Sequence, residues 1–161
     1  MTKMLIEGMP LWIAETNAWI VAQSGPGGEC VLIDAPPGDV WDALRDFGAV
    51  HQRLAPGFVV DCRLEGNARV VTFFNGAVAR ELLVDIDDDA RRLVYSIVES
   101  PLGSTHDNSS AQVVSDADGR SRFVWIKDVL PDELAPRIDE LMTHGIGVVK
   151  QTLEAPTRSR D

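Results

Sequence analysis

Six short apolar segments follow one another closely between residues 58 and 130, and they are predicted to be strands. Turn sequences rich in Gly, Asn and Asp, such as EGN and DADG, separate them. Parallel pairing would need a crossover of a dozen or more residues between neighbouring strands, and these gaps are shorter. The segments are 58–66, 68–76, 77–87, 91–100, 110–116 and 120–130. The sequence therefore predicts an antiparallel sheet.

The part of the chain before these segments is predicted to form a hairpin followed by a short helix. NAWIVAQ (17–23) and ECVLIDA (29–35) are short apolar runs, and the SGPGG between them suits a tight connection. Pro36 and Pro37 can end a strand and start a helix, because proline has a helical φ and its missing N–H costs nothing in a first turn. The helix that follows has one apolar stripe at spacings of three and four, formed by Val40, Trp41, Leu44 and Phe47. We expect this helix to pack on a neighbouring element.

The last part of the chain is predicted to be one long amphipathic helix within PDELAPRIDELMTHGIGVVKQTLEA (131–155), with Asp132 as its N-cap. Its apolar residues are Leu134, Ile138, Leu141, Met142, Ile146, Val149 and Leu153. A sheet of about seven strands twists and curls, so the helix is expected to bury its stripe against the concave side. A curled sheet around a single helix does not always close its interior. We therefore expect a cavity between them.

Composition and charge restrict the function. The chain of 161 residues has a formal net charge of -10, which would repel phosphate backbones, so we expect no nucleic-acid partner. No apolar run approaches the roughly 20 residues of a membrane span, and the N-terminus has no signal-peptide pattern, so a cytoplasmic protein is expected. Cys30 and Cys62 lack metal-ligand spacing and are interpreted as buried thiols. No cofactor or metal is predicted, and a homodimer is left open.

Four stretches of the chain resemble the SRPBCC superfamily, and more narrowly its polyketide cyclase/dehydrase-like branch. They are VLIDAPPGDVWDALRDFGAVHQRLAPG, CRLEGNARVVTF, ARELLVDIDDDARRLVYSIVESPL and RSRFVWIKDVLP, followed by the closing helix. The resemblance covers about residues 28 to 156. It implies the α+β helix-grip fold of the plant abscisic-acid receptors and the birch-pollen allergen type, with two short helices after the first strand. By this similarity, the helix after the Pro-Pro joint helps to wall one side of a pocket.

The beginning of the chain also resembles a second family. MPLWIAETNAWIVAQSGPGGECVLIDAPP (9–37) is similar to the first hairpin of a metallo-β-lactamase-fold hydrolase. The HxHxDH motif that should follow is absent, and His51, His106 and His144 are far apart in the sequence. We interpret residues 1–26 as an N-terminal extension that adds a strand or packs over the sheet. Residues 27–156 are the predicted SRPBCC domain, and 157–161 are a frayed tail.

The resemblance to the abscisic-acid receptors implies several pocket residues. Glu81 matches a pocket glutamate, and Tyr95 and Ile97 match an aromatic residue and an isoleucine. Strand alternation independently places Tyr95 and Ile97 on one face. The loops 73–77, which contains Phe74, and 99–104 match the gate and latch over the pocket mouth. Two departures argue against a carboxylate hormone: the latch lacks its histidine-arginine pair, and Phe58, Val59 and Val60 occupy the strand of the ligand-binding lysine.

Three further residues are candidate ligand contacts, each with a structural alternative. Trp125 alternates with Phe123 on one strand face, where most such residues fill the core. Asp107 reaches the pocket rim or caps a strand end. His144 lies in the closing helix near two glycines, which leave room for a ligand, and a partly exposed helix histidine is the alternative.

Two functions from different classes follow from these residues. The first is binding of a hydrophobic small molecule, such as a lipid, a polyketide or an isoprenoid-like compound, in the cavity. The second is a polyketide cyclase or aromatase, which needs a general acid or base within hydrogen-bond reach of the substrate. The candidates for that role are Glu81, Tyr95, Asp107 and His144, and no contiguous catalytic signature supports them. Regulation of a partner protein through the acidic surface or the N-terminal extension is a third alternative.

Overall fold

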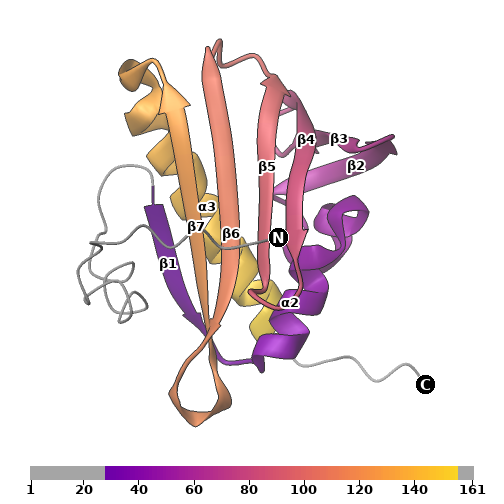
Figure 1. Ribbon diagram of the computed structural model, residues 1–161. Coiled ribbons are helices and arrows are strands. Elements are labelled where there is room, and N and C mark those ends of the chain that lie inside the picture. Colours follow the sequence, from indigo (N-terminus) through magenta and orange to yellow (C-terminus); the bar gives the residue numbers. More distant parts are fainter. Residues whose placement is uncertain (1–27, 156–161) are drawn as a thin grey trace, which may run out of the picture.

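Residues 28–155, which the computed structural model describes, form a seven-stranded antiparallel sheet curled around a long helix (Figure 1). The strands are β1 (Gly28–Ile33), β2 (Val59–Glu65), β3 (Ala68–Phe73), β4 (Val78–Asp87), β5 (Arg92–Glu99), β6 (His106–Ser115) and β7 (Ser121–Leu130). Their order in the sheet is β1-β7-β6-β5-β4-β3-β2. Every strand from β2 onward pairs with its chain neighbour, and β1 pairs with β7. The predicted antiparallel sheet is confirmed.

Irregular pairing bends the sheet along β4. The register shifts between Arg80 and Glu81 and again between Leu83 and Asp85, and β2 has a similar irregularity near its start. Such bulges bend a strand and increase its twist. They accompany the turn of the sheet that sets β2 and β3 steeply across β5, β6 and β7 in Figure 1. The curl creates the concave side on which the long helix lies.

Strand β6 begins four residues before the predicted start at Ser110. The extra residues, from His106 to Ser109, are polar, so they do not show the apolar alternation that marked the other strands. Asp107 and Ser109 are nevertheless buried on the inner face, with 2% and 0% of their surface exposed. They contact Lys127 of β7 there, which explains why a buried strand position can be polar. The predicted boundary at Ser110 is therefore wrong.

The helices lie on the concave side of the sheet and at its end. α2 (Pro37–Arg45) starts at the Pro-Pro joint, and its predicted stripe is buried, with Val40, Trp41 and Leu44 at most 7% exposed. Two short helical turns follow, η2 (Phe47–Ala49) and η3 (Val50–Leu54). The long helix α3 (Ala135–Glu154) comes after a short turn, η5 (Asp132–Leu134). Asp132 is not its N-cap, since that position is Leu134 and no side chain caps it.

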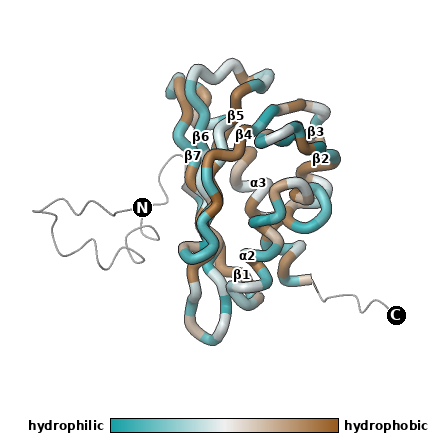
Figure 2. Tube along the Cα trace, turned by 45° about the vertical axis from the view of Figure 1, so that its right-hand side comes forward, coloured by the Kyte–Doolittle hydropathy of each residue, from teal (hydrophilic) through white to brown (hydrophobic). Residues whose placement is uncertain are grey.

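The core lies between the sheet and α3. In the hydropathy-coloured trace, α3 lies between β6 and β7 on one side and β2 and β3 on the other (Figure 2). Ile138, Met142, Ile146 and Val149 of α3 are at most 6% exposed, so its stripe faces the sheet as predicted. This arrangement is a helix-grip fold.

Some predictions lie outside the described residues. They are the first hairpin strand at 17–23, the N-terminal extension at 1–26 and the tail at 157–161. The second strand of the predicted hairpin is β1, whose hydrogen-bonded neighbour among residues 28–155 is β7.

Candidate functional site: an apolar cavity between the sheet and the long helix

A cavity of about 140 Å³ lies between the concave face of the sheet and α3. Its wall is mainly apolar, and every layer of the fold contributes to it. The sheet contributes Leu93, Ala111 and Phe123, and α3 contributes Ile138, Met142 and Gly145. The volume is close to that of an engineered apolar cavity of about 150 Å³ that binds benzene in another protein. A molecule the size of one ring therefore fits without movement of the protein.

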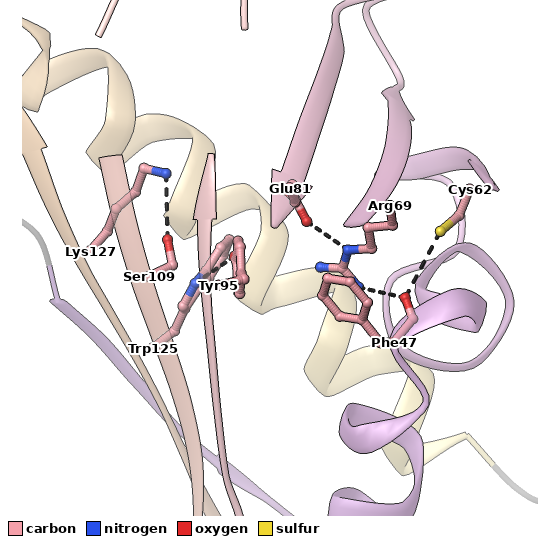
Figure 3. Close-up of polar contacts among 8 residues, drawn as sticks. All are labelled: Phe47, Cys62, Arg69, Glu81, Tyr95, Ser109, Trp125 and Lys127. Atoms are coloured by element: carbon pink, nitrogen blue, oxygen red, sulfur yellow. Dashed lines mark hydrogen bonds and ion pairs between the residues drawn. The ribbon is translucent and has the colours of Figure 1, made fainter. Parts of the chain in front are cut away.

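An ion pair is buried in the cavity wall at β3 and β4. Arg69 and Glu81 face each other directly in the strand register, and Arg69 Nε donates to Glu81 Oε2 at 2.6 Å (Figure 3). Arg69 Nη1 also donates to the Phe47 carbonyl at 2.9 Å, and the guanidinium lies 4.1 Å from the centre of the Phe47 ring. The two charged residues are only 7% and 4% exposed. Arg69 thus holds the Glu81 carboxylate in place and ties it to η2.

The middle of the sheet contributes a hydrogen-bonded aromatic pair. Trp125 Nε1 on β7 donates to the Tyr95 hydroxyl on β5 at 3.2 Å, and both residues line the cavity (Figure 3). Burial raises the pKa of Tyr95 strongly, and the negative charge of Glu81 raises it further. The hydroxyl therefore remains protonated at ordinary pH. It serves as a neutral polar group in a mainly apolar wall.

A second ion pair lies on the other side of the aromatic pair. Lys127 Nζ on β7 donates to Asp107 Oδ1 on β6, and it lies 3.5 Å from Ser109 Oγ. Lys127 lines the cavity, whereas the Asp107 side chain has no exposed area. Asp107 Oδ2 is buried without a hydrogen-bond partner. Burial raises the pKa of Asp107, and the positive charge of Lys127 only partly offsets this.

Two loops and the middle of α3 complete the lining. Asn75 and Ala77 come from the loop at 73–77, and Pro101 and Leu102 come from the loop at 99–104. These are the two loops that the resemblance to the receptors places over a pocket mouth. Gly145, near the middle of α3, lies close to two aromatic rings: an added Cβ would lie 3.0 Å from Phe58 and 3.1 Å from Trp125.

The structure brings together four of the seven residues that were predicted to contact a ligand. Glu81, Tyr95, Ile97 and Trp125 line the cavity. The other three residues are Phe74, Asp107 and His144, and none of them is part of the lining. Whether any of the seven contacts a ligand stays a prediction.

Each of the three residues outside the lining has other contacts. Phe74 is 47% exposed, and its ring centre lies 4.8 Å from that of His144, which is also exposed. Both stack near Phe58, whose ring forms part of the cavity wall. Asp107 lies behind Lys127, as described above. Phe74 and His144 thus lie on the outer side of an aromatic wall.

Two cavity residues, Arg69 and Lys127, were missed by sequence reasoning. Both are charged residues at inward strand positions, where apolar residues are expected. Strand alternation could have predicted that Lys127 points inward, because it is two residues from Trp125 and four from Phe123 and shares their face. For Arg69 the signal was its position opposite Glu81, which depends on a register that the sequence alone does not determine.

The histidines lie on three separate elements. His51 belongs to η3, His106 begins β6 and His144 lies in α3. Among residues 28–155, no three or more His, Cys, Asp or Glu side chains are grouped so that they could hold a metal ion. In the same range, no helix has the length and apolar character needed to cross a membrane.

Comparisons with known proteins identify the family. The model of the family described as polyketide cyclase/dehydrase and lipid transport matches residues 21–154. The chain belongs to this family. The match confirms the resemblance to the SRPBCC superfamily, and it begins within the segment that was predicted to be an N-terminal extension. No curated protein matches the chain.

Solved structures share the fold of this family member. An uncharacterized protein from Bacillus thuringiensis aligns with a TM-score of 0.72 at 19% identity, over 80% of this chain and 98% of that one. A protein from Thermobifida fusca aligns with a TM-score of 0.67 at 27% identity, over 79% and 89% of the two chains. A START superfamily protein from Mycobacterium smegmatis aligns with a TM-score of 0.60 at 12% identity, over 79% and 92%. The predicted helix-grip fold is therefore confirmed.

Proposed function

We propose that this protein binds a small apolar molecule in the cavity between the sheet and α3. The observation that carries the proposal is the cavity itself, a partly open and mainly apolar space lined by sheet, helix and loops. Burial of an apolar ligand there would remove its surface from water, which is favourable by roughly 25 cal/mol per Å². The description of the family, which includes lipid transport, supports a ligand of this kind.

The size of the cavity limits the ligand. Sites for drug-sized ligands usually measure about 300 to 1,000 Å³, and this cavity has about 140 Å³. One aromatic or alicyclic ring fits it as it stands. A longer lipid or polyketide would need the loops at 73–77 and 99–104 to move apart, since both contribute to the lining.

The polar groups of the cavity favour binding over catalysis. The carboxylate of Glu81, the best acid-base candidate in the sequence, accepts a hydrogen bond from Arg69 and is 4% exposed. Tyr95 has a raised pKa and accepts a hydrogen bond from Trp125. Glu81 is thus held in an ion pair and Tyr95 stays protonated, whereas a general base has to accept a proton from the substrate within hydrogen-bond reach. Cyclase activity therefore remains the second hypothesis.

Calorimetric titration of the full chain with ethylbenzene tests the proposal. We expect saturable binding with one site, and loss of at least about tenfold in affinity in Ala111→Leu, which fills the cavity from β6. Ala117→Leu is the matched control, because Ala117 is exposed in the turn between β6 and β7 and should leave binding unchanged. Equal affinities in both variants, or no binding by the wild type, would contradict the proposal. Native mass spectrometry of the protein from its own host would then identify the natural ligand by its mass.

A further inference from the structure

The ammonium group of Lys127 has one N–H donor without an acceptor among residues 28–155. A lysine ammonium carries three N–H donors. Asp107 Oδ1 accepts one of them and Ser109 Oγ, at 3.5 Å, is within reach of a second. No third acceptor is present among residues 28–155 in the structure. Lys127 is 8% exposed and lines the cavity, so a ligand inside the cavity is in a position to accept the remaining hydrogen bond.

The charges around the cavity disfavour an anionic ligand. Asp107 offsets the charge of Lys127, and Glu81 offsets that of Arg69, so the two buried pairs leave no net charge on the sheet wall. Arg137 also lines the cavity, but it is exposed, and water weakens its field. A carboxylate ligand would have to lose its hydration without gaining an unpaired cation. The net charge of -10 would further repel it.

A carbonyl or ether oxygen matches the free donor better than a hydroxyl group does. Such an oxygen only accepts hydrogen bonds, whereas a hydroxyl also needs an acceptor for its own hydrogen. The acceptor closest to Lys127 is Asp107, and its side chain has no exposed area, so the cavity does not reach it. Glu81 already receives the Arg69 hydrogen bond.

We propose that Lys127 donates a hydrogen bond to a carbonyl or ether oxygen of a neutral ligand whose apolar ring fills the cavity. This inference rests on the proposed function, because it names the class of molecule that the cavity takes. Asp107 and Ser109 act as positioning residues, since they hold the ammonium group at the wall. Lys127 is thereby the residue that selects among apolar ligands of equal size.

Three probes of similar size separate this inference from the proposed function. They are acetophenone, which has a neutral carbonyl, ethylbenzene, which is apolar, and benzoate, which is an anion. Calorimetric titration of the wild type should give an affinity for acetophenone about fivefold higher than for ethylbenzene, with benzoate weakest. Equal affinities for acetophenone and ethylbenzene, or a preference for benzoate, would overturn the inference and leave the proposed function standing. Absence of binding by all three probes would overturn both.

A double variant links the preference to the ion pair. Lys127→Met with Asp107→Leu removes both charges together, so that neither is left buried alone. We expect the preference for acetophenone over ethylbenzene, taken as the ratio of the two affinities in the same variant, to disappear. Arg122→Met with Asp116→Leu is the matched control, because it removes a pair that involves β7 and is not part of the lining. Retention of the acetophenone preference in the Lys127 variant would overturn the inference.

Discussion

The two buried ion pairs of the concave face are built differently. Arg69 and Glu81 lie directly opposite each other in the register, and Arg69 has further contacts with the carbonyl and the ring of Phe47. Lys127 and Asp107 lie on a diagonal between β7 and β6, and one oxygen of Asp107 has no partner. The first pair therefore fastens parts of the fold to each other. In the second pair, the Lys127 ammonium lines the cavity and has one N–H donor left, so a ligand in the cavity can add the missing partner.

The largest effect is expected from breaking the first pair. Arg69→Leu leaves the Glu81 carboxylate buried without its cation, and we expect the free energy of unfolding to fall by about 3–5 kcal/mol. Urea denaturation measures this change. The double variant Arg69→Leu with Glu81→Leu should recover most of the loss, because it leaves no buried charge unpaired. A loss below about 1 kcal/mol in the single variant would show that the pair does not fasten the fold.

A smaller effect should appear in the pH dependence of the second pair. Burial raises the pKa of Asp107 above its ordinary value of 3.8, so the folded protein keeps this proton to higher pH than the unfolded chain does. The stability that this proton contributes is complete below about pH 3.8 and is lost as the pH rises through the raised pKa. The free energy of unfolding of the wild type, relative to Asp107→Asn, should therefore fall from pH 4 toward neutral pH. A relative stability that rises with pH would show that attraction by Lys127 outweighs burial.

The smallest effect concerns the rings of Phe58 and Trp125, which lie next to Gly145 of α3. Gly147→Ala should raise the free energy of unfolding by about 0.5–1 kcal/mol, because alanine favours a helix and no atom lies within 4 Å of the added Cβ. Gly145→Ala should gain less or lose stability, since its Cβ would press on the rings of Phe58 and Trp125. Thermal unfolding of the two variants side by side measures the difference. Equal gains in the two variants would mean that α3 does not pack tightly against these two rings.

Local patterns predicted the fold well. The Pro-Pro joint, the apolar stripe of α2 and the closely spaced strands each depend on neighbouring residues, and the structure has all of them. Polar residues hid the start of β6, because Asp107 and Ser109 are buried through contacts with another strand. The N-cap prediction at Asp132 was wrong because a short helical turn precedes α3. Contacts within a segment can be predicted from the residues of that segment, whereas contacts between strands depend on the register of their pairing.

The candidate site was predicted only in part for the same reason. Glu81, Tyr95, Ile97 and Trp125 were found through strand alternation and resemblance. Arg69 and Lys127 belong to pairs that form across strands, and a charged residue in a strand suggests solvent exposure when it is considered alone. His144 and Phe74 were chosen for their chemistry and position, but they contact each other on the outer side of Phe58.

The most direct test of the central claim is a crystal structure of the protein grown with acetophenone. The claim is that the cavity binds the ring of a ligand and that Lys127 donates a hydrogen bond to the ligand's oxygen. The account predicts electron density for the ring beside Ala111, Trp125 and Gly145, with the carbonyl oxygen within hydrogen-bond distance of Lys127 Nζ. An empty cavity, or acetophenone bound only on the outer surface of the protein, would contradict it.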